Sequence, residues 1–137
     1  MQARSWRWLM LLLVVVSLVG CSSDDDDEDI AQVSGNYQGT IQDSIAGPGT
    51  LRVSIIQQGN QLSGSWQSSF NNAANDNSGT LSGTAGEDDA QVIFTPARVT
   101  ACPFQTTLDV NDSRLQGTYA AFNCTTTLTG TLSVTRQ

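Results

Sequence analysis

The sequence predicts an all-β fold, a single eight-stranded antiparallel up-and-down β-barrel. The first observation is a pattern that occurs five times: an apolar residue, then glycine two positions later, then an aromatic or apolar residue after two more. It begins at Val33, Leu62, Leu81, Leu115 and Leu128. The positions between are nearly all Ser, Thr, Gln or Asn, so apolar and polar side chains alternate as in half-buried strands. The second observation is that no stretch of this region has a helical period.

Turn signals divide the region into eight expected strands. These are residues 33–42, 50–58, 61–70, 79–86, 90–98, 104–110, 113–121 and 127–135. Gly59-Asn60 and Asn111-Asp112 predict tight hairpins, and residues 86–89 predict a short acidic turn. The other four connections are longer. Because the loops of a meander alternate between two ends, we expect the four long loops to share one end of the barrel.

The repeated glycines fall at inward positions of the expected strands. Glycine allows strands to coil sharply and leaves room for large side chains opposite, as a small barrel requires. A barrel of eight strands has an interior that side chains can fill, or that holds one small ligand. Both possibilities remain open from the sequence.

The first 20 residues have the pattern of a secretory signal. Arg4 and Arg7 precede an apolar run over 9–16, which is too short to cross a hydrocarbon core of about 30 Å as a helix. The segment Leu18-Val19-Gly20-Cys21 resembles the lipobox of bacterial lipoproteins. This resemblance implies that residues 1–20 form a lipoprotein signal peptide and that Cys21 becomes lipidated, which anchors the chain to a membrane. The alternative is an ordinary cleaved signal with an incidental cysteine.

The lipobox resemblance also implies a location. Ser22 follows the cysteine, where an aspartate tends to retain such proteins at the inner membrane, so we expect a lipid anchor in the outer membrane. The protein would face the periplasm or the cell surface. Six consecutive acidic residues, 24–29, cannot form a core, and they predict a solvated tether over residues 21–30. This tether is a simple spacer or a signal for export to the surface. The barrel domain is then expected over residues 31–137.

The amino-acid composition argues against several classes of function for that domain. The chain has no histidine and no lysine, and the region after the tether has four arginines and seven acidic residues. Nucleic acid is therefore not an expected partner. Histidine is the commonest general base and metal ligand, so its absence argues against catalysis and metal binding. We expect no catalytic residues, no metal and no cofactor.

Two cysteines remain after Cys21. Cys102 lies in the expected long loop between the fifth and sixth strands, and Cys124 in the loop between the seventh and eighth. The alternation of loops places both at the same end of the barrel, and compartments beyond the inner membrane are oxidising. The sequence therefore predicts a disulfide between Cys102 and Cys124.

The start of the domain is similar to the calycin superfamily, which includes lipocalins and avidins. Gly35-Asn36-Tyr37 resembles the Gly-x-Trp motif of their first strand, and Leu62-x-Gly64-x-Trp66 resembles the third strand of an avidin. The resemblance implies a small barrel of this shape, without specifying a ligand.

Seven residues are candidates for contact with a ligand. Tyr37, Trp66 and Tyr119 have inward parity, and each is either core or ligand contact. Phe70, Arg98, Phe104 and Phe122 are expected near the mouth, the end with the long loops. Arg98 would hold a carboxylate there or extend to water at the rim.

These features favour a membrane-anchored module that binds a small apolar or amphipathic ligand. One alternative is a protein-interaction module, such as an envelope inhibitor or assembly factor, with a filled barrel. The other is a purely structural envelope protein.

We predict that Cys21→Ser leaves an uncleaved or soluble precursor, because a serine cannot carry the thioether-linked lipid. Mass spectrometry of the mature N-terminus checks the prediction, and an unmodified Cys21 in the wild-type protein would contradict it.

Overall fold

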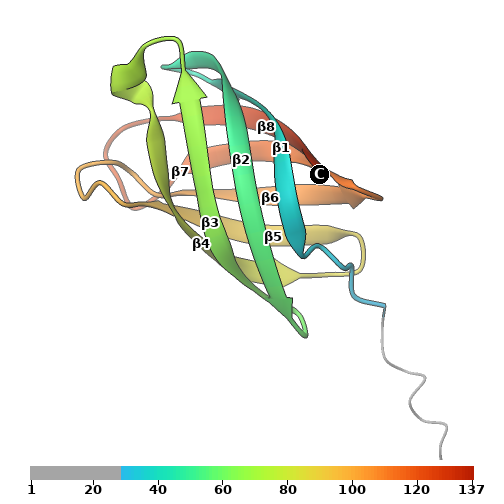
Figure 1. Ribbon diagram of the computed structural model, residues 1–137. Helices are drawn as coiled ribbons and strands as arrows, with labels where there is room; N and C mark the ends of the chain where they lie inside the picture. Colours follow the sequence, from blue (N-terminus) through green and yellow to red (C-terminus); the bar gives the residue numbers. More distant parts are fainter. Residues whose placement is uncertain (1–28) are drawn as a thin grey trace, which may run out of the picture.

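The computed structural model describes residues 29–137, which form a closed barrel (Figure 1). Each strand pairs antiparallel with the next in the chain, and the last pairs with the first. The strands are β1 (Gly35–Asp43), β2 (Gly47–Gln58), β3 (Gln61–Phe70), β4 (Asn77–Ala85), β5 (Asp89–Pro96), β6 (Phe104–Asn111), β7 (Arg114–Ala121) and β8 (Thr129–Arg136), with one 3₁₀ turn, η3 (Ala73–Asn75), before β4. The predicted eight-stranded up-and-down barrel is confirmed. Among these residues, no helix has the length and apolar character to cross a membrane.

Three predictions fall outside the described residues: the signal peptide over 1–20, the lipidation of Cys21 and the tether as far as residue 28. They stay predictions.

Some strand ends differ from those expected. The ladder between β1 and β2 continues as far as the pair Asp43–Gly47, so their connection is shorter than predicted. The β6–β7 turn is shifted by one residue, because Asn111 still pairs with Arg114 and Asp112 takes the positive φ of 56°. β5 ends at Pro96, two residues early, since proline cannot donate to the ladder.

The inward positions form one core along the axis of the barrel. Large apolar side chains are almost fully buried, and several inward glycines lie between two of them on the neighbouring strands. Gly64, for example, pairs with Ile55 on one side and Leu81 on the other. A Cβ at Gly64 would lie 1.9 Å from the carbonyl oxygen of Ser54, at a φ of +154°. The backbone approach that coils the strands here is therefore open only to glycine.

The segment before β1 closes the end of the barrel that carries the tight turns. Val33 is fully buried. The Gln57 side chain accepts a hydrogen bond from the Val33 amide at 2.7 Å and donates one to the Ala31 carbonyl at 2.9 Å. The Ala31 amide also donates to Gly86 in the β4–β5 turn at 2.7 Å. The chain thus enters at the closed end, as Figure 1 shows, and the long-loop end is the mouth.

The predicted disulfide is confirmed. Cys102, in the β5–β6 loop, and Cys124, in the β7–β8 loop, are bonded with their Cα atoms 5.8 Å apart. Both loops lie at the mouth, so the bond joins two neighbouring hairpins there.

Replacing both cysteines with serine is expected to lower the free energy of unfolding by about 3 kcal/mol, because the bond closes a loop of 22 residues in the unfolded chain. Urea denaturation of the double variant measures this loss, with the wild type under reducing conditions as the control. An unchanged midpoint in both would show that the bond does not constrain the unfolded state.

Candidate functional site

Four aromatic rings fill the middle of the barrel. Trp66 makes edge contacts with Phe94 and Phe104, with ring centroids 5.6 and 5.4 Å apart. Phe94 stacks on Phe104 at 5.0 Å, and Tyr119 contacts Phe104 at 4.8 Å. The indole N–H of Trp66 donates to the carbonyl of Thr80 at 2.9 Å, which fixes the ring. Three of these rings, Trp66, Phe104 and Tyr119, form the floor of a cavity at the mouth, with Phe94 packed beneath them.

A cavity of about 240 Å³ opens above this floor, between the loops of the mouth. Its aromatic lining is Trp66, Phe70, Phe104 and Tyr119, its aliphatic lining includes Ile41, Ile45 and Leu128, and its polar side chains include Asp43, Ser68, Asn77 and Arg98. Ligand pockets are commonly about 300–1,000 Å³. At about 240 Å³ this cavity lies below that range, so it has room only for a molecule smaller than most ligands.

The polar wall of the cavity is built across three strands. Tyr119 on β7 pairs with Gly130 on β8, and Gly130 pairs with Asp43 on β1. The Tyr119 hydroxyl passes over Gly130 and donates to Asp43 Oδ2 at 2.6 Å. A Cβ on Gly130 would lie 2.4 Å from that hydroxyl oxygen, so glycine is what leaves the path open.

Asp43 also organises the first loop of the mouth. Its Oδ1 accepts hydrogen bonds from the backbone amides of Ile45 and Ala46, at 2.8 and 2.9 Å. The carboxylate thereby holds the short β1–β2 turn against the cavity.

Burial raises the pKa of Tyr119, and the hydrogen bond to Asp43 and the negative charge of that carboxylate raise it further. The side chain is only 3% exposed. The phenol therefore stays protonated well above its ordinary pKa of about 10 and remains a hydrogen-bond donor to Asp43.

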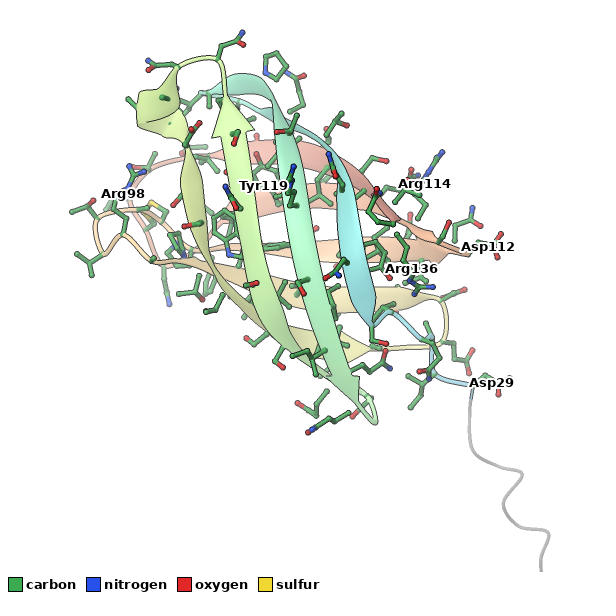
Figure 2. The ribbon with its side chains drawn as sticks, viewed as in Figure 1. Asp29, Arg98, Asp112, Arg114, Tyr119 and Arg136 are labelled. Carbon is green, nitrogen blue, oxygen red and sulfur yellow. A yellow bond between two sulfur atoms is a disulfide. The ribbon has the colours of Figure 1, made fainter. Side chains whose placement is uncertain are left out.

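Arg98 lies at the rim, at the end opposite Asp112, Arg114 and Arg136 (Figure 2). The expected strand 90–98 would give Arg98 the same inward parity as Phe94, but β5 already ends at Pro96, and the Arg98 side chain is exposed in the loop. Its guanidinium donates to the backbone oxygen of Asp76. Asp76 in turn accepts from the Phe70 amide at 2.8 Å, so these residues brace the β3–β4 loop.

Five of the seven predicted ligand residues line the cavity: Trp66, Phe70, Arg98, Phe104 and Tyr119. Tyr37 does not, because it lies at the closed end, where its hydroxyl donates to Val33 at 2.8 Å and accepts from Arg136 at 2.9 Å. Phe122 is half-buried outside the lining, with its amide bonded to Pro103. Ligand contact by any of the seven stays a prediction.

The sequence reasoning missed Asp43 and Ser68. Asp43 continues the inward parity of Tyr37 and Ile41, but it lies one residue beyond the expected strand 33–42. Ser68 shares the parity of Trp66 and is 3% exposed, with a long 3.4 Å hydrogen bond to the Asn77 carbonyl. Parity alone would have placed both inside the barrel. Within residues 29–137, no group of three or more His, Cys, Asp or Glu side chains is arranged to hold a metal ion.

No protein-family model and no curated protein matches the chain. Solved structures of redesigned β-barrels do match it in shape. The barrel mFAP1 bound to DFHBI has a TM-score of 0.66 at 11% identity, over 76% of this chain and 94% of that one. The barrel mFAP2b bound to DFHBI also has a TM-score of 0.66 at 11% identity, over 77% of this chain and 94% of its own. A third redesigned barrel has a TM-score of 0.64 at 15% identity, over 77% of this chain and 91% of its own. At these identities the likeness shows a shared barrel fold.

Tyr119→Phe is expected to lower the free energy of unfolding by about 1.5 kcal/mol, because it removes a hydrogen bond to a charged group. In the wild type, the raised pKa contributes stability that is complete below about pH 10 and is lost as the pH rises further, since only the unfolded chain ionises there. Urea denaturation at neutral and alkaline pH measures both effects. A variant whose stability declines above pH 10 as steeply as the wild type would contradict the assignment.

Proposed function

We propose that this protein is a membrane-anchored envelope lipoprotein whose barrel binds a small apolar or amphipathic ligand at its mouth. Lipid on Cys21 would hold it in the outer membrane, facing the periplasm or the cell surface. The closed end of the barrel receives the chain from the tether, so the mouth would face away from the membrane.

The observation that carries the binding role is the cavity above the aromatic floor. Its 240 Å³ are bounded by rings and aliphatic side chains, with a few polar groups at the wall and rim. Concave apolar sites with few placed polar groups are the usual form of small-molecule sites. Two designed barrels of the same fold are bound to DFHBI, which supports the use of such a barrel for a small ligand.

We propose binding without catalysis. The chain contains no histidine. In the site, the Tyr119 proton is held by the Asp43 carboxylate and its pKa is raised, which is the opposite of what a tyrosine base or nucleophile requires.

A second candidate is a protein-interaction module. Two apolar side chains in different loops of the mouth face solvent: Ile45 is 63% exposed and Val99 is 95% exposed. With the middle of the barrel filled by aromatic rings, these loops could be the active surface. Val99→Ser would weaken the binding of a protein partner while leaving a small ligand bound on the aromatic floor, because Val99 does not line the cavity.

Trp66 is the only tryptophan after the signal peptide, so the emission of the mature protein reports the floor of the cavity. We expect blue-shifted emission that phenethyl alcohol or 1-hexanol changes in a saturable manner. Ile93→Ser, on the outer wall, is the control, and its response should equal that of the wild type. Emission that neither compound alters would contradict the ligand-binding role and favour the interaction module.

A further inference from the structure

The charge of Asp43 has no counter-charge among its hydrogen-bond partners. In the described part of the chain, the carboxylate is half-buried and accepts three hydrogen bonds, all from neutral donors: two backbone amides and the Tyr119 hydroxyl. Oδ2 has a single partner and can accept another hydrogen bond. A half-buried carboxylate in this state attracts a cation, because neutral donors solvate the charge without cancelling it.

The surroundings of Asp43 also favour a positively charged ligand. Trp66, Phe70 and Phe104 line the cavity with Asp43, and the faces of aromatic rings attract cations. Residues 29–137 contain eight acidic side chains and four arginines, so the field of the domain is negative. The one arginine of the cavity, Arg98, is exposed at the rim and is engaged with the backbone of Asp76.

We propose that the cavity selects a small organic cation, an amine or ammonium group on an apolar body. The cationic group would bind Asp43 Oδ2 beside the Tyr119 hydroxyl, and the apolar body would lie on the Trp66–Phe104 floor. This rests on the proposed function, since it names the ligand class of the same site. It assigns Asp43 as the residue that sets specificity, with Tyr119 as a positioning residue that holds the carboxylate.

Three probes that share a phenyl ring but differ in charge separate the contribution of the charge to the binding affinity from that of the apolar ring. Phenethylamine is a cation at neutral pH, phenethyl alcohol is neutral and phenylacetate is an anion. Each is titrated into the mature lipoprotein in phosphatidylcholine nanodiscs, with empty nanodiscs as the blank, and binding is followed by Trp66 emission and by calorimetry. We expect the amine to bind about tenfold more tightly than the alcohol, which is the scale of one charge-assisted hydrogen bond. Phenylacetate should bind most weakly.

Asp43→Asn retains the shape of the carboxylate and its acceptor oxygen for the turn amides. It should reduce the affinity for the amine to that of the alcohol, without changing the affinity for the alcohol. Asp109→Asn is the matched control, because it removes the same charge from an exposed position on β6, and it should preserve the preference for the amine. Trp66 emission and the urea midpoint verify that both variants are folded.

The remaining outcomes are distinguishable. If the alcohol or phenylacetate binds the wild type as tightly as the amine, or if Asp43→Asn keeps the preference, the cation proposal is wrong while the binding role stands. If no probe binds by either method, the proposed function itself fails.

Discussion

A barrel closed from eight strands has an interior only as wide as the side chains that fill it, and most of this structure follows from that constraint. Large inward residues need space, and here an inward glycine on the neighbouring strand provides it. Trp66 lies beside Gly79, Tyr119 beside Gly130, and Leu62 beside Gly83. Because packing of this kind leaves no room at mid-barrel, an open space remains only at an end.

The two ends of the barrel therefore differ in character. At one end, the segment that precedes β1 is buried and hydrogen-bonded to Gln57 and to the β4–β5 turn. At the other end, the hairpin loops are held apart from the aromatic floor by the disulfide, by the Asp43 turn and by the brace between Arg98 and Asp76. These contacts fix the loops around the cavity, whose floor includes Trp66.

The sequence predicted the strand order, the mouth and the disulfide because each depends on a local or topological rule. Alternating side chains give the faces of the strands, and alternating loops bring Cys102 and Cys124 to one end. It failed where long-range pairing decides the outcome. Nothing local in the sequence shows that the β1 ladder continues to Asp43, which lies beyond the expected strand 33–42. The expected inward position of Arg98 is wrong because β5 ends at Pro96. Tyr37 has the correct parity, but its depth along the barrel depends on the segment packed beneath it.

The row Tyr119–Gly130–Asp43 crosses the seam where the first and last strands of the barrel meet. The hydrogen bond from Tyr119 to Asp43 joins residues 76 positions apart in the chain. The same residues therefore close the seam and form the wall of the cavity. Fraying of β8 would dismantle that wall. A molecule held by Asp43 would bind only the closed seam, and mass action would then slow the exchange of amide protons along β8. Occupancy of the mouth would in this way control how often the barrel opens along its length.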